Sequence, residues 1–281
     1  MTQILACIDA SAYAPSVCDM AAWAALRLDL PVELLHVVQR KDAIAERHDL
    51  SGAIGLGVKS SLLEELTRLE ETEARLQVER GRVLLAASRE RLEAAGVAQV
   101  RPLHRHGGIV ETILEREAGA RLVVIGKRGA SHEFATDHLG SKVERVVRAS
   151  DLPVLIASRR VATPKAIVLA YDASKAARRA LDRVAHSPLF AGLPVTIVMA
   201  GSDSREHRDA LAEAAAALPG TVETQLLPGK PEAAIAEAVE AIPDAMLVMG
   251  AYGHSPLRAL IVGSTTSAMM RTLHVPMLLI R

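Results

Sequence analysis

The strongest constraint on this chain of 281 residues is that its sequence repeats about halfway along. ILACIDAS (4–11) reappears as IVLAYDAS (167–174), and GSKVERVVRASDLPVLIAS (140–158) is matched by GSTTSAMMRTLHVPMLLIR (263–281). The Pro lies thirteen positions after the Gly in both copies of the second pair. Since the length suits two domains of about 140 residues, the repeat predicts two copies of one fold.

Within each copy, apolar runs of strand length alternate with stretches of helical period. In the second copy AIVLAYD (166–172) has the length and composition of a buried strand, and SKAARRALDRVAHS (174–187) repeats its apolar residues every three to four positions. Near-continuous apolar strands that alternate with helices indicate a parallel sheet covered on both faces. The sequence therefore predicts an α/β fold in each half.

A polar stretch, SRRVATPK (158–165), separates the two copies, so we expect domains at 1–160 and 161–281. The first domain carries a helical insert at about 40–96, within which residues 60–96 predict one long amphipathic helix. Its charged face is either solvated or a surface for a protein partner.

Charge and cysteine content narrow the class of protein. Lys and Arg together number 33, as do Asp and Glu, so no global field favours nucleic acid or a membrane surface as partner. Cys7 and Cys18 form no metal-binding spacing and are expected to be reduced core thiols. The N-terminus lacks a basic segment, and no stretch reaches the roughly 20 apolar residues of a membrane span. We therefore expect a cytoplasmic protein.

Three glycines near the end of the chain raise a more specific possibility. Gly250 ends an apolar strand, Gly253 follows in the next loop, and Gly263 stands before a helix that opens with Ser264 and Thr265. Ligands bind beyond the carboxyl ends of parallel strands, and a helix N-terminus with free N–H groups suits phosphate. The alternative is that the glycines serve a tight turn and a helix cap.

The spacing Gly250-x2-Gly253-x9-Gly263-Ser264, with the strands VLAYDAS and HVPMLLIR, resembles the nucleotide-binding signature of the universal stress protein family. The likeness extends over nearly the whole chain, twice. It implies two tandem Rossmann-like domains, each a five-stranded parallel sheet flanked by helices, as in the adenine nucleotide alpha hydrolases. It also implies ATP as ligand, with Mg²⁺ left open, and a regulatory role in the stress response. Domains of this family pair through their last strands, which implies pairing of the two halves, a homodimer and an unidentified protein partner.

The resemblance also implies which residues hold the nucleotide. An acid at the end of the first strand contacts the adenosine, main chain at the end of the second strand meets adenine, and the glycine loop holds the triphosphate. In the second half these positions are Asp172, Ala200, Gly250, Gly253, Gly263, Ser264 and Thr265. In the first half they are Asp9, Val37, Gly126, Gly129, Gly140 and Ser141.

The first half departs from the pattern, because ten residues rather than nine separate Gly129 from Gly140. Lys142, with Lys127 and Arg128, could attract phosphate, whereas Glu144 and Asp137 would oppose it. Lys127 and Arg128 could equally be solvated charges of the loop. We expect the second half to be the better ATP site. No acid or base is placed to activate water, so no catalytic residue is predicted and any ATPase activity should be weak. The alternatives are an interaction module with empty sites and a slow ATP hydrolase.

His104 and His106 lie two residues apart in RPLHRHGG and would share one face of a strand. Such a pair could bind a metal, but no third ligand is evident nearby. Ordinary surface histidines are therefore the preferred interpretation, and no metal site is predicted.

Overall fold

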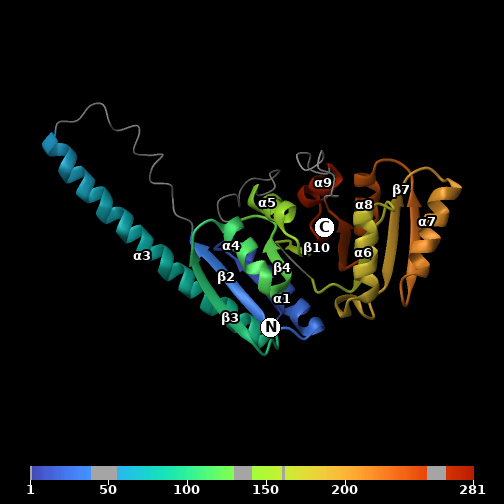
Figure 1. The fold of residues 1–281 in the computed structure, drawn as a ribbon, viewed down its shortest axis with the longest axis horizontal. Coiled ribbons are helices and arrows are strands. Elements are labelled where there is room, and N and C mark those ends of the chain that lie inside the picture. Colours follow the sequence, from blue (N-terminus) through green and yellow to red (C-terminus); the bar gives the residue numbers. More distant parts are fainter. Residues whose placement is uncertain (1, 39–55, 130–140, 160–161, 252–263) are drawn as a thin grey trace.

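The computed structural model describes residues 2–38, 56–129, 141–159, 162–251 and 264–281 (Figure 1). Ten strands form one sheet in the order β3-β2-β1-β4-β5-β10-β9-β6-β7-β8. The two halves of this order are the same arrangement read in opposite directions. The strands are β1 (Gln3–Ile8), β2 (Val32–Val38), β3 (Val100–His106), β4 (Ala120–Gly126), β5 (Val154–Ala157), β6 (Ala166–Ala170), β7 (Val195–Ala200), β8 (Val222–Leu227), β9 (Ala245–Gly250) and β10 (Met277–Ile280).

Helices cover both faces of the sheet, as the near-continuous apolar strands predict. On one face α1, α3, α6 and α7 enclose one apolar core, and on the other α4, α5, α8 and α9 enclose a second. Successive residues of β1 alternate between the two cores. The helices are α1 (Ala14–Leu28), α3 (Leu56–Ala94), α4 (Ile109–Arg116), α5 (Ser141–Ala149), α6 (Lys175–His186), α7 (Arg205–Ala216), α8 (Pro231–Glu240) and α9 (Ser264–Thr272), with short 3₁₀ turns at Glu117–Gly119 and Pro188–Phe190.

Local sequence explains where several helices begin. The Ser174 hydroxyl accepts a hydrogen bond from the backbone N–H of Ala177 at 3.2 Å and so caps α6. Ser204 caps α7 in the same way, through the N–H of His207 at 3.2 Å. The cap and the apolar spacing together place both helices against the sheet.

The halves meet where β5 pairs with β10, with Leu155 opposite Leu278. This pair is antiparallel, whereas the other strand pairs are parallel. The last strands of the two copies thus pair within one chain, as expected. The boundary expected at 160 and 161 lies outside the described residues, and the division into two domains stays a prediction.

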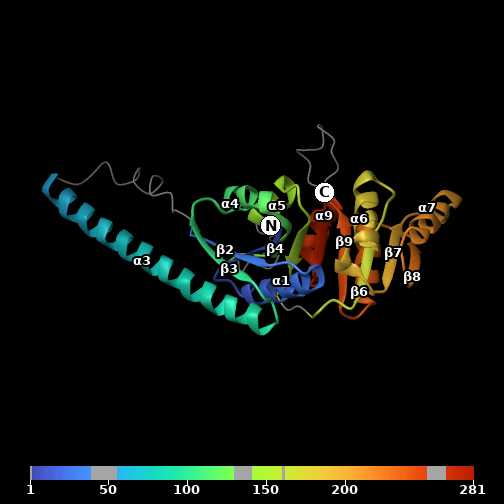
Figure 2. The same cartoon turned by 60° about the horizontal axis from the view of Figure 1, so that its bottom comes forward.

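The long helix α3 occupies 56–94, close to the expected 60–96, and its first part extends away from the rest of the molecule (Figures 1 and 2). Its second part packs on the sheet through the buried Leu85, Ser88 and Leu92. No helix within the described ranges is long and apolar enough to cross a membrane. Cys7 and Cys18 are buried free thiols, as predicted.

Candidate functional site

A pocket lies beyond the carboxyl ends of β1 and β4, where the strand order of the first half changes direction. Such a switch point is where open α/β sheets bind ligands. The pocket, counted with its open mouth, has an empty volume of about 670 Å³. Its lining comes from β1, α1, α4, β4 and α5, and comprises Cys7, Ile8, Asp9, Tyr13, Ala14, Val17, Ile109, Ile113, Ile125, Gly126, Arg128, Gly129, Lys142, Val143 and Val146.

Asp9 is the carboxylate of this pocket and stands directly after β1. Its Oδ1 accepts a hydrogen bond from the backbone N–H of Ser11 at 3.2 Å, which orients the side chain. A Cβ on Gly129 would lie 2.8 Å from Asp9 Oδ2, so the bare backbone lets the loop after β4 come this close without displacing the carboxylate. The first acid and the second glycine of the motif are therefore neighbours in space.

Gly126 has a different reason to be glycine. A Cβ there would lie 2.7 Å from the Cβ of Tyr13, which stands just before α1. Close packing of α1 against the end of β4 therefore needs a bare backbone at this position. This packing places Tyr13 in the wall of the pocket, a role that the sequence motif did not reveal.

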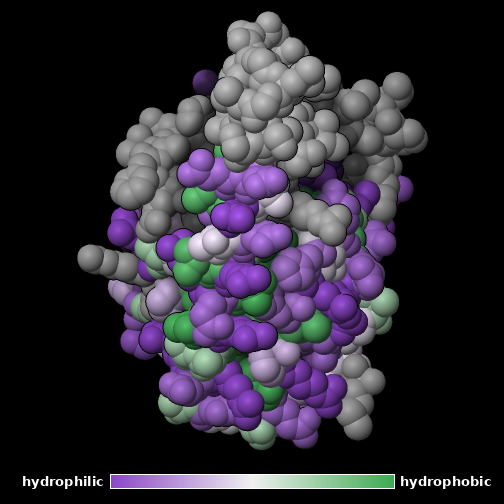
Figure 3. Space-filling model, turned by 90° about the vertical axis from the view of Figure 1, so that its left-hand side faces the viewer, coloured by the Kyte–Doolittle hydropathy of each residue, from purple (hydrophilic) through white to green (hydrophobic). Residues whose placement is uncertain are grey.

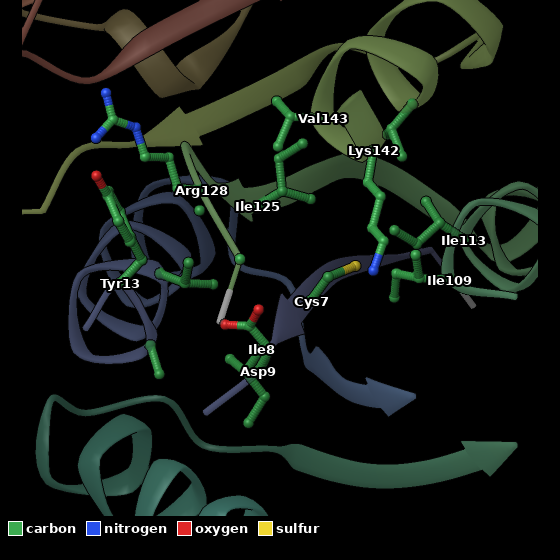
Figure 4. A pocket seen from close by; sticks show the side chains of 15 residues that line it. Cys7, Ile8, Asp9, Tyr13, Ile109, Ile113, Ile125, Arg128, Lys142 and Val143 are labelled. Carbon is green, nitrogen blue, oxygen red and sulfur yellow. The ribbon is translucent and has the colours of Figure 1, made fainter. Parts of the chain in front are cut away.

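Positive charge reaches the same pocket from two elements. Arg128 belongs to the loop after β4, and Lys142 belongs to the first turn of α5. Figure 4 shows the Lys142 ammonium directed into the pocket toward Cys7 and Ile109, with the Asp9 carboxylate entering from the end of β1. The N-terminal end of α5 adds its own partial positive charge. The pocket therefore joins one carboxylate, an apolar floor and a cationic end.

The second half repeats part of this arrangement. Asp172 follows β6, is exposed, and accepts a hydrogen bond from the N–H of Ser174 at 3.0 Å, as Asp9 does from Ser11. A Cβ on Gly250 would lie 2.5 Å from the backbone of Ala176, so this glycine permits α6 to pack against the end of β9. Gly253 and Gly263 lie outside the described residues.

The start of α9 differs chemically from the start of α5. The Thr265 hydroxyl donates a hydrogen bond to Glu232 Oε1 of α8 at 2.9 Å. Thr265 occupies the position that Lys142 holds in the first half. The second half thus has a carboxylate and an engaged hydroxyl where the first half has an ammonium, which is less favourable for phosphate.

The remaining candidate residues are spread over the same sheet edge. Val37 and Ala200 are half-buried near the ends of β2 and β7, the corresponding strands of the two halves. Ser141 and Ser264 are the first residues of α5 and α9, and Gly140 lies outside the described residues. Those candidates of both sets that the structure describes therefore lie at the carboxyl edge, and a pocket is described at the first set.

Lys127 does not take the place near phosphate that its sequence position suggested. Its Nζ donates hydrogen bonds to the backbone oxygens of Arg271 at 2.9 Å and Leu273 at 2.6 Å, at the end of α9. Burial, with a smaller effect of Arg128, lowers the pKa of the Lys127 amine to about 8. Beside it, the Ser158 hydroxyl donates to the Val275 oxygen at 2.8 Å. Lys127 therefore connects the halves instead of lining the pocket.

His104 has a second histidine neighbour that the sequence did not reveal, because His36 lies opposite it on β2. The ring centroids are 5.0 Å apart for His36 and His104, and 5.8 Å apart for His104 and His106. Burial lowers the pKa of His36 and of His104. Within the part of the chain that is described, no group of three or more His, Cys, Asp or Glu side chains could hold a metal ion.

Comparison with known proteins identifies a family, a related sequence and related structures for this chain. The model of the "Universal stress protein family" matches residues 1–158 and 196–281. A universal stress protein of Synechocystis is 33% identical over 287 residues, which cover 100% of both chains. The crystal structure of a universal stress protein from Archaeoglobus fulgidus superposes with a TM-score of 0.72 at 22% identity, covering 99% of this chain and 98% of that one. A functionally unknown protein from Pseudomonas aeruginosa PAO1 gives 0.62 at 15% identity, covering 100% and 92%. These two structures share the fold.

Proposed function

The chain belongs to the universal stress protein family, which supports a role in the stress response, and from this membership we propose that its first half binds ATP and that nucleotide occupancy regulates the protein. One observation carries the proposal: Asp9 and Gly129 are close neighbours at the mouth of a pocket that also receives Lys142. A carboxylate, a close-lying bare backbone and a cation at a helix start are three groups that an adenine nucleotide can use at once.

In this assignment the two ends of the ligand meet different chemistry. The Asp9 carboxylate accepts hydrogen bonds from ribose hydroxyls or from the adenine amino group. The apolar lining near Asp9, which includes Ile8, suits the flat face of a base (Figure 4). The phosphates lie toward Lys142 and the first turn of α5, where N–H groups and the ammonium favour negative charge. Mg²⁺ would arrive with the phosphates, because Asp9 is the carboxylate among the lining residues and lies at the other end.

This proposal reverses the order of the halves that the motif spacing favoured. The second-half site stays a prediction, since Gly253 and Gly263 lie outside the described residues. The Glu232 carboxylate of α8 is hydrogen-bonded to Thr265 at the start of α9 and would repel phosphate there. We therefore propose the first half as the stronger site, with weak hydrolysis at most.

The test begins with nucleotide released from freshly purified protein, quantified per chain by chromatography. Calorimetric titration with Mg-ATP follows, using the matched variants Asp9→Asn and Asp172→Asn. We expect about one ATP per chain, with affinity at least tenfold weaker in Asp9→Asn and unchanged in Asp172→Asn. Absence of binding in the wild-type chain would favour an interaction module, and loss in Asp172→Asn alone would return the site to the second half.

A further inference from the structure

The outer face of α3 carries a line of exposed apolar side chains. Leu66, Leu69, Leu76 and Val83 are 38%, 58%, 52% and 62% exposed. They follow one another at spacings of three, seven and seven residues, so they share one face of the helix. We call these four residues the outer stripe. Figure 3 looks at this end of the molecule and shows apolar side chains among polar ones.

The outer stripe is turned away from the protein's own core. The face of α3 that docks on the sheet contains Gly81, Leu85, Ser88 and Leu92, at spacings of four, three and four. With 100° of rotation per residue, Val83 lies about 200° from both Gly81 and Leu85. The two faces are thus opposite, and a partner on the outer stripe would not displace α3 from the sheet.

The length of the helix makes this face unusual. At 39 residues, α3 is about 58 Å long, and its first part extends beyond the sheet (Figures 1 and 2). Most helical stability in proteins comes from packing of an apolar face, and large exposed leucines at heptad spacing are typical of a coiled-coil seam. The outer stripe therefore indicates a second helix.

The distribution of charge along α3 indicates the identity and the direction of this second helix. Residues 64–73 contain five Glu and one Arg, a net charge of −4, whereas residues 75–91 contain five Arg and two Glu, a net charge of +3. An antiparallel copy of α3 would set the acidic part of each helix against the basic part of the other. A parallel copy would set like charges side by side.

We propose that α3 pairs with α3 of a second copy of this chain in an antiparallel coiled coil. In an antiparallel register with Leu66 at an a position and Leu69, Leu76 and Val83 at d positions, a faces d, so Leu66 faces Val83 of the second copy. Leu69 and Leu76 then pack on the aliphatic stems of Arg80 and Glu73 of the second copy. A parallel pair would instead bring Glu73 against Glu73 and Arg80 against Arg80. This surface is separate from the nucleotide pocket and from the last strands, which pair within the chain.

The test is the oligomeric state of the full chain by sedimentation equilibrium at micromolar concentration. We expect a dimer, and at least hundredfold weaker dimerisation in the double variant Leu69→Glu/Leu76→Glu. The matched control is Leu26→Glu, which alters an exposed leucine on α1 (55% exposed) and should leave the dimer intact. A monomeric wild-type chain, or a dimer that survives the double variant, would overturn the proposal.

Cross-linking tests the orientation. Leu66→Cys chains are mixed with Val83→Cys chains and treated with a short bis-maleimide, and the products are identified by mass spectrometry. The native Cys7 and Cys18 are buried and interfere little. Predominant 66-to-83 products support the antiparallel pair, whereas predominant 66-to-66 and 83-to-83 products contradict it. Because neither position touches the pocket, ATP binding should be unchanged in both variants, which separates this result from the fate of the nucleotide proposal.

Discussion

The two halves of the chain share one strand order but differ at the residues around their proposed sites. In the first half Lys142 of α5 and Asp9 line the same pocket. In the second half the corresponding Thr265 is bound to Glu232. The strands that form the sheet thus have the same apolar pattern in both copies, whereas the second residue of the last helix is a lysine in one copy and a threonine bound to a carboxylate in the other. A shared fold therefore leaves the two sites free to differ in affinity.

The connection between the second and third strands shows the same contrast. In the second half α7 spans 12 residues, whereas in the first half α3 spans 39. Both helices cover the same face of the sheet. The additional length of α3 extends beyond what the sheet can cover, so it supplies a surface that only the first half possesses.

The largest expected effect separates the two sites directly. In Gly129→Val the new side chain would collide with Asp9, because even a Cβ would lie 2.8 Å from Oδ2. We expect ATP affinity to fall at least hundredfold, measured by calorimetry, while the circular dichroism spectrum is kept. The matched change Gly253→Val in the second half should leave affinity unchanged. The opposite pattern would assign the nucleotide to the second half.

Replacing Lys127 tests how far the stability of the chain depends on contact between the two halves. The second half has Ala251 at the corresponding position and so lacks an equivalent of this lysine. Lys127→Met leaves the oxygens of Arg271 and Leu273 without their donor, so we expect the free energy of unfolding to fall by about 2 kcal/mol. Urea denaturation gives this value. Lys165→Met, which removes an exposed ion pair with Asp244, is the control and should cost clearly less than Lys127→Met. An equal loss of unfolding free energy in the two variants would show that Lys127 contributes no more than an exposed ion pair.

The cost of Lys127→Met should also depend on pH. The pKa of Lys127 falls from 10.5 in the unfolded chain to about 8 in the fold, so between these values the unfolded state binds more protons. The wild-type chain therefore gains stability as pH rises from about 8 toward 10.5, and the Met variant lacks this gain. A cost that stays constant over this range would contradict the lowered pKa.

Removing the charge of Lys142 in one variant and of Glu232 in another should bring the ATP affinities of the two sites closer together. Lys142→Thr removes the ammonium from the first pocket, and we expect ATP to bind about tenfold more weakly because a charge-assisted contact is lost. Glu232→Gln removes the carboxylate beside Thr265 and should increase binding in the second half. Lys142→Thr is titrated with ATP in the Asp172→Asn background, and Glu232→Gln in the Asp9→Asn background. An unchanged affinity in Lys142→Thr would place the phosphates elsewhere.

The smallest expected effect concerns α3, which only the first half carries. A Cβ on Gly81 would lie 2.6 Å from the His104 ring and 2.8 Å from His36 Nδ1. Gly81→Ala gains about 1 kcal/mol in helix propensity, but crowding of a packed site costs about 1–3 kcal/mol. We expect a net loss of about 1 kcal/mol in the free energy of unfolding, with faster hydrogen exchange in α3. Stabilisation would show that the imidazoles move aside freely.

The sequence was sufficient for features that depend on local pattern. Apolar runs such as ILACI and AIVLA became β1 and β6, and the family resemblance implied that the last strands of the two copies would pair. Side-chain direction was not predictable in the same way. Lys127 stands inside the glycine motif, yet its partner Arg271 lies 144 residues further along the chain. Likewise Glu232 and His36 became neighbours of Thr265 and His104 only through the packing of separate elements.

The pairing of β5 with β10 has a consequence for synthesis of the chain. During translation β5 is complete once residue 157 has emerged, whereas β10 begins only at Met277. Until then β5 is an edge strand with unpaired backbone groups, at the centre of what will become a ten-stranded sheet. Neighbouring chains on one messenger RNA expose the same edge at the same time, which favours wrong pairing between them. The ribosome's pace over the last 120 or so codons thus sets how long this edge stays open.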